Sequence, residues 1–129
     1  MKTLTIDGHS ITDLPSFYRE INRVFMADVD WELGRSLDAL NDALYGGYGA
    51  IDGAEPVKLV WLNMERNRAD LGFECTRNWY LDKLKHPGDF DVERIAKDLA
   101  DLEGGMGPTY FDIVLEIIGD HPNIELVAG

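Results

Sequence analysis

The sequence is poor in cysteine and has no long apolar run. Its single cysteine, Cys75, excludes an internal disulfide, and no neighbouring residues complete a zinc-binding motif. No apolar stretch approaches the length that spans a membrane, and the N-terminal MKTLTIDGHS lacks the hydrophobic block of a signal peptide. We therefore expect a cytoplasmic protein that does not insert into or bind a membrane.

Positive charge is also scarce. Lysine and arginine total 12 against 24 aspartates and glutamates, and the formal net charge is −12. Contacts to phosphate require clustered lysine and arginine, so this balance argues against binding of nucleic acid or of an anionic membrane. Two interpretations stay open: the acidity attracts a basic protein partner, or it only keeps the chain soluble.

The motifs of the common enzyme and metal classes are missing as well. The sequence has no Walker, Rossmann or nucleophile-elbow glycine pattern. Its three histidines, His9, His86 and His121, are widely separated and do not predict a ligand cluster. The acidic segment 28–34 (DVDWELG) lacks the terminal bidentate glutamate of a calcium loop. We therefore expect no cofactor, no metal and no enzyme activity.

What the sequence does contain is the pattern of one α/β domain covering 1–129. β-forming apolar patterns predict three strands at KTLTID (2–7), PVKLVWL (56–62) and NIELVA (123–128). Helical spacing of apolar residues predicts helices over 12–26, 36–45, 91–103 and 108–119, while 73–89 fits either a helix or a loop. Strands separated by helices predict parallel pairing, with 64–107 as an elaborated connection before the last helix.

The segment GRSLDALNDALYGGY (34–48) carries the candidate site. Asp38 and Asp42 lie four residues apart, and a stripe of leucines predicts that both face away from the core. From the pattern alone, a solvated helix face is the favoured interpretation. The alternative that stays open is an acidic pair presented to a metal, an arginine or a lysine.

The order of these segments resembles the barstar family of ribonuclease inhibitors. The matching features are a first strand that closes at Ile6-Asp7-Gly8, the helix S-L-D-A-L-N-D-A-L before two glycines, and the strand P-V-K-L-V-W that ends at Trp61. The similarity covers 1–63 and about 108–127, and 64–107 looks like an insertion. The resemblance implies a three-stranded parallel sheet packed with helices and an inhibitor rather than an enzyme.

The resemblance also implies a partner, a basic ribonuclease or nuclease toxin whose active site is plugged by the second helix and the loop before it. The family's two helix aspartates fall on Asp38 and Asp42, and the second takes the place of a substrate phosphate. A later glutamate that faces the nuclease falls on Glu116. The aspartates and this glutamate form the acidic part of the implied binding surface.

Aromatic contact positions of the family's type member fall here on other residues. They correspond to Glu32, Asn41 and Gly47, and Tyr48 is adjacent to the last. The resemblance therefore implies that a protein, monomeric when free, binds its partner through Asp38, Asp42, Asn41, Glu32, Tyr48 and Glu116. Two alternatives stay open: an acidic adaptor that makes contact through 64–107, and a small-ligand or metal-binding enzyme built on Asp38, Asp42 and Glu116.

Overall fold

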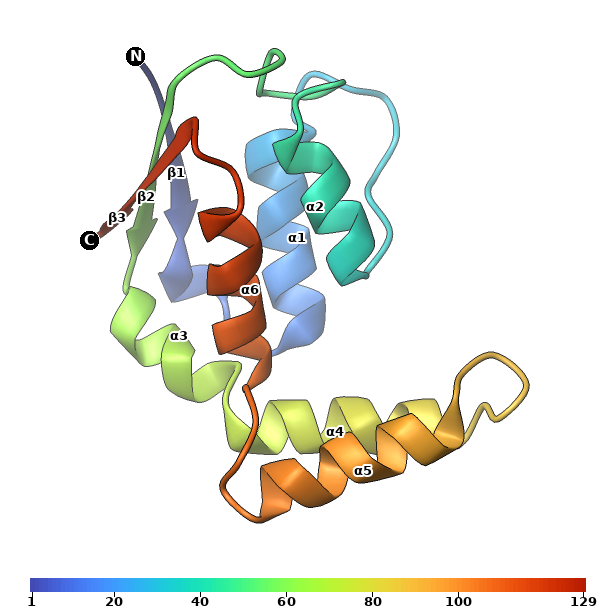
Figure 1. Cartoon of the computed structure of the whole chain (residues 1–129). Coiled ribbons are helices and arrows are strands. Elements are labelled where there is room, and N and C mark those ends of the chain that lie inside the picture. The colour runs from blue at the N-terminus through green and yellow to red at the C-terminus, as the bar shows by residue number, and fades with distance from the viewer.

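The computed structural model describes residues 1–129, and its strands form one parallel sheet (Figure 1). The sheet order is β1-β2-β3, and β2 pairs with both neighbours, so that Trp61 lies opposite Ile6 on one side and Ala128 on the other. The strands are β1 (Lys2–Asp7), β2 (Val57–Leu62) and β3 (Ile124–Ala128). The predicted three-stranded parallel sheet is confirmed.

Six α-helices and a short 3-10 helix connect the strands. Their bounds are η1 (Gly8–Ser10), α1 (Leu14–Phe25), α2 (Leu37–Leu44), α3 (Met64–Asp70), α4 (Phe73–Leu84), α5 (Val92–Glu103) and α6 (Tyr110–Gly119). The helices predicted over 12–26, 36–45, 91–103 and 108–119 are confirmed. Most of the undecided segment 73–89 is helical as α4, and α3 is an additional helix that was not predicted. No helix combines the length and apolar character needed to cross a membrane.

Side-chain caps fix where the main helices begin. The Asp13 carboxylate accepts a hydrogen bond from Ser16 N at 2.9 Å, and the Ser16 hydroxyl accepts one from Asp13 N at 3.0 Å. Ser36 Oγ accepts from Ala39 N at 3.1 Å and starts α2 in the same way. These bonds satisfy backbone donors that would otherwise lack partners.

The core lies between one face of the sheet and the helices. Figure 1 shows α1, α2 and α6 on the same side of the sheet, and alternate residues of β2 are buried. Trp61 is fully buried at the centre, where Phe17 stacks on it at 6.1 Å and Phe111 meets it at 5.5 Å between ring centroids. Large aromatic side chains thus hold the helical layer against the sheet.

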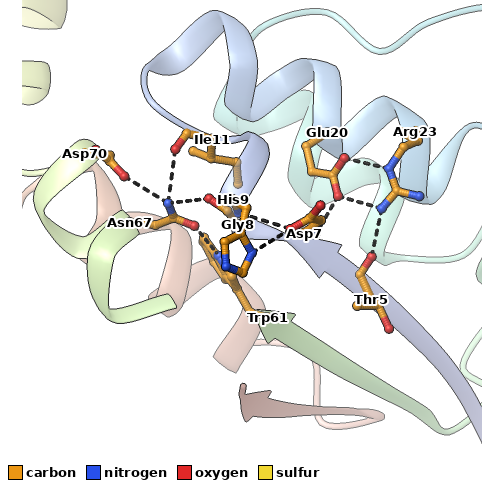
Figure 2. Close-up of polar contacts among 10 residues, drawn as sticks. All are labelled: Thr5, Asp7, Gly8, His9, Ile11, Glu20, Arg23, Trp61, Asn67 and Asp70. Carbon is orange, nitrogen blue, oxygen red and sulfur yellow. Dashed lines mark hydrogen bonds and ion pairs between the residues drawn. The ribbon is translucent and has the colours of Figure 1, made fainter. Parts of the chain in front are cut away.

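A polar network lies beneath the carboxyl ends of β1 and β2 (Figure 2). The buried Asn67 accepts a hydrogen bond from Trp61 Nε1 at 2.8 Å and donates from Nδ2 to the carbonyls of Gly8 at 3.0 Å and Ile11 at 3.3 Å. A Cβ at Gly8 would collide with the carbonyl of Leu62 and the amide of Asn67. Asn67 therefore joins α3 to the start of the chain, and glycine is required at position 8.

The same network continues into α1 through a buried carboxylate. Glu20 is only 4% exposed, and its oxygens accept hydrogen bonds from Asp7 N and from the Arg23 guanidinium, each at 2.6 Å. Arg23 also donates to the Thr5 carbonyl at 3.2 Å, and its hydrogen bonds with Glu20 raise the pKa of the guanidinium. The pair ties α1 to the end of β1 (Figure 2).

Helices α4 and α5 form a hairpin, here called the arm (residues 73–103), that projects from the rest of the molecule (Figure 1). Within the arm, Tyr80, Ile95 and Leu102 make a small hydrophobic cluster of their own. At its base the Trp79 ring meets the Tyr110 ring edge-on at 4.9 Å. The arm is thus a hairpin with a separate small core and an aromatic junction to α6.

Candidate functional site

Helix α2 presents its two aspartates to solvent. Leu40, Ala43 and Leu44 are buried against the core, and Asp38 and Asp42 lie exposed on the other side of the helix. The ion pairs of the chain involve other residues, so both carboxylates are open to a cation from outside. The outward orientation predicted from the leucine spacing is confirmed.

The start of α2 favours negative charge. Asp38 lies in the first turn, where the positive end of the helix dipole stabilises a carboxylate. Arg35, just before this turn, forms no ion pair with Asp38. It lies close enough to Asp13 to contribute to the lowered pKa of that carboxyl, which results mainly from hydrogen bonds with Ser16. Asp38 therefore keeps its free carboxylate.

An aromatic pair lies beside Asp42. The rings of Trp31 and Tyr48 meet with centroids 4.8 Å apart, and Trp31 remains 46% exposed. Burial raises the pKa of the Tyr48 hydroxyl, and the negative charge of Asp42 raises it further. The loops before and after α2 thus meet next to Asp42, with the exposed Glu32 adjacent to Trp31 in the chain.

Asn41 is engaged inside the protein. Its Oδ1 accepts a hydrogen bond from His121 Nε2 at 2.8 Å, and His121 is buried. The ring of Tyr45 contacts the His121 ring edge-on at 4.6 Å and is itself exposed. Asn41 therefore links α2 to the turn between α6 and β3, which gives it a structural contact in addition to its predicted place on the surface.

Glu116 lies on α6 and is exposed. Helix α6 packs beside α2, but the Glu116 side chain forms no hydrogen bond or ion pair with the other five predicted residues. The structure thus brings Asp42 close to Tyr48 and Tyr48 against Trp31, the residue before Glu32. Asp38 lies at the other end of α2, and Glu116 on the adjacent helix.

Two side chains at this surface escaped the sequence analysis. Trp31 was not assigned to it, although a large aromatic residue in an acidic loop is a usable signal of a binding site. Lys83, on α4 of the arm, shares a recess of about 550 Å³ with Asp38. Nothing in the local sequence connects Lys83 with Asp38, because their proximity depends on how the arm is placed against α2. No group of three or more His, Cys, Asp or Glu side chains is placed to hold a metal ion.

Comparison with known proteins identifies the family of the chain. A family model described as Barstar (barnase inhibitor) matches residues 1–104. No curated protein matches the chain in sequence. The matched range contains β1, α1, α2, β2 and the whole arm, and it ends before α6 and β3, where the second part of the resemblance and Glu116 lie. The chain therefore belongs to the barstar family, whose members are ribonuclease inhibitors rather than enzymes.

Proposed function

We propose that this protein inhibits a basic ribonuclease, or confers immunity to a nuclease toxin, by covering the active site of that enzyme with the outer face of α2. Family membership supports an inhibitory or immunity role in general. The geometry of α2 supports this particular mode of binding. The observation that carries the proposal is the exposure of Asp38 and Asp42, without ion-pair partners, on a capped helix packed against the core.

The two carboxylates can take the place of RNA phosphates. A nuclease active site holds its substrate through arginine, lysine and protonated histidine side chains, and a carboxylate offers these groups the same charge and hydrogen-bond acceptors as a phosphate. Arginine binds a carboxylate in two parallel hydrogen bonds, which strengthen when water is excluded. In the proposed complex Asp42 occupies the substrate phosphate position, and Asp38 adds negative charge in the first turn of the same helix.

The remaining predicted residues surround this pair. Glu32 and Glu116 add negative charge beside α2, and Tyr48 supplies an aromatic surface next to Asp42. Asn41 supports the helix through its hydrogen bond with His121 and is half-buried, so part of it remains accessible to the partner. Trp31 packs against Tyr48 with its ring tilted, and it enlarges the aromatic surface next to Asp42. Such a rim excludes water from the ion pairs at the centre.

The overall charge supports the same partner. With a net charge of −12 the chain repels RNA and attracts a basic enzyme. This attraction acts before contact and therefore raises the association rate more than the lifetime of the complex.

The proposal is tested by binding to a panel of catalytically inactive basic ribonucleases that includes barnase. We expect at least one member to bind, and Asp42→Ala to weaken that complex about 10- to 100-fold, because each hydrogen bond to a charged group contributes about 1.5–3 kcal/mol. The matched control is Asp101→Ala, which removes an exposed aspartate from α5. Its effect should stay within about twofold. An unchanged affinity for Asp42→Ala, or no binding to any member, would overturn the proposal.

A further inference from the structure

The recess between the first turn of α2 and the arm is continuous with the proposed partner surface. Figure 1 shows the start of α2 directed toward the arm. Asp38 lines the recess from the α2 side, and Trp79, Lys83 and Phe90 line it from the arm. A nuclease that covers Asp38 therefore also covers the mouth of this recess.

The arm holds a positive charge in the recess. The Lys83 ammonium lies 4.0 Å from the centroid of the Trp79 ring and 5.1 Å from that of the Phe90 ring. Aromatic faces attract a cation, and two of them fix the position of this one. Burial lowers the pKa of Lys83, and the negative charges of Asp38 and Asp98 act in the opposite direction and favour the charged form. Lys83 forms no ion pair that would cancel its charge.

The two aspartates of α2 therefore differ in their surroundings. Asp42 lies next to Tyr48 and does not line the recess that holds Lys83. The recess at the Asp38 end is lined by two cations, Lys83 and Arg35, and by two carboxylates, Asp38 and Asp82. A cationic group of the partner that enters this recess meets the positive charge of Lys83 and Arg35 as well as the two carboxylates.

We propose that Lys83 is a specificity-determining residue of the partner-binding surface. It repels a lysine or arginine that a nuclease places in the recess beside Asp38, and it donates a hydrogen bond to a carboxylate or carbonyl oxygen that a nuclease presents to its ammonium. This inference rests on the proposed function of α2. Selectivity of this kind comes from a repulsive element that excludes wrong partners as much as from attraction to the right one.

The test compares Lys83→Met with Lys85→Met on the same ribonuclease panel. Methionine keeps the apolar stem and removes the charge, and Lys85 is exposed at the end of α4, so both variants change the net charge equally. We expect Lys83→Met to tighten the weaker complexes more than the tightest one, and to shrink the ratio between them by about 3- to 10-fold. Lys85→Met should leave this ratio unchanged. An equal ratio in the two variants, or a uniform loss of affinity in Lys83→Met, would overturn the role of Lys83.

Two further variants keep the test decisive. Phe90→Ala removes one exposed wall of the clamp without removing the charge, and it should shift the same ratio in the same direction by a smaller factor. Asp42→Ala separates the two proposals. If Asp42→Ala weakens binding and Lys83→Met behaves like Lys85→Met, only the role of Lys83 fails. If Asp42→Ala changes no affinity, the proposed function itself fails.

Discussion

Two regions of the molecule treat polar side chains in opposite ways. Beneath the ends of β1 and β2, Asn67 and Glu20 are buried and bonded to backbone and side-chain partners (Figure 2). On α2, Asp38 and Asp42 are exposed and unpaired. A buried polar group without a partner is costly, so the hydrogen bonds of Asn67 and Glu20 stabilise the fold. The second contributes little to stability and is available to a partner.

Asn41 lies between these two extremes. It belongs to α2 and is flanked by the exposed aspartates in sequence, yet its amide is bonded to the buried His121. A residue at a binding surface can thus serve the fold. The difference between structural and binding roles is set by partners and burial, and position on the helix alone does not decide it.

The largest effect is expected from breaking the buried network. Asn67→Ala leaves the indole N–H of Trp61 and the carbonyl of Ile11 without their side-chain partner, and the carbonyl of Gly8 keeps only its bond from Ile11 N. We expect a loss of about 3 kcal/mol or more in the free energy of unfolding, measured by urea denaturation. Asn78→Ala, at an exposed position of α4, is the control. A loss below about 1 kcal/mol would show that the network does not stabilise the fold as described.

A smaller effect is expected at the intermediate residue. Asn41→Ala deprives the buried His121 Nε2 of its acceptor and should lower the free energy of unfolding by about 1–2 kcal/mol. Its affinity for the nuclease should fall less than that of Asp42→Ala. If instead stability is unchanged and affinity collapses, Asn41 contacts the partner directly and its bond to His121 is unimportant.

High pH should lower the free energy of unfolding through two tyrosines of the core. The hydroxyls of Tyr18 and Tyr110 are bonded to each other inside the protein, and burial raises the pKa of Tyr18 to about 12. In the unfolded chain the pKa of tyrosine is about 10, so the unfolded state loses its proton first and stability falls as pH rises from about 10 to about 12. Near pH 11 we expect Tyr18 alone to account for a loss of about 1 kcal/mol in the free energy of urea unfolding.

The double variant Tyr18→Phe/Tyr110→Phe serves as the check on that dependence. It should reduce the alkaline loss of stability, whereas Tyr45→Phe, at an exposed position, should not. The Cys75 thiol, whose pKa burial raises to about 11, acts in the same direction and is removed in both backgrounds by Cys75→Ala. Equal alkaline losses in the double variant and in Tyr45→Phe would contradict this assignment.

The smallest change is expected from added salt, which should lower the association rate constant with the nuclease. Ions screen charges that lie more than about 10 Å apart at 0.1 M salt, so the association rate constant should fall about threefold between about 0.05 and 0.3 M. The free energy of unfolding should change little, because Glu20 of the Glu20–Arg23 pair is buried and also accepts a hydrogen bond from the backbone of Asp7. Stopped-flow mixing measures the first quantity. A rate independent of salt would exclude electrostatic attraction between the proteins.

The sequence predicts most of the fold because most elements have clear hydrophobic periodicity. The pattern of α4 did not distinguish a helix from a loop, because its apolar residues face two directions. Trp79 contacts Tyr110 of α6, and Tyr80 packs against α5 within the arm. Helix α3 was missed because it is short and polar, and its one buried side chain is Asn67. Its position is set by bonds to residues more than fifty positions away in the chain.

The site was predictable to a similar degree. The outward orientation of Asp38 and Asp42 follows from the leucine spacing of a single helix. The contacts of Trp31 with Tyr48 and of Asn41 with His121 join residues from separate elements. Periodicity carries no information about such pairs. That 64–107 is an insertion relative to the smaller inhibitors stays a prediction.

Competition with a nucleotide tests the role of Asp42 most directly. If Asp42 takes the place of a substrate phosphate, the protein and a 3′-mononucleotide cannot occupy the nuclease together. With the tightest-binding ribonuclease of the panel, the apparent Kd of the wild-type complex should rise in proportion to the nucleotide concentration. A Kd that stays constant when the active site is saturated with nucleotide would place the interface elsewhere on the enzyme and contradict the proposed mode of inhibition.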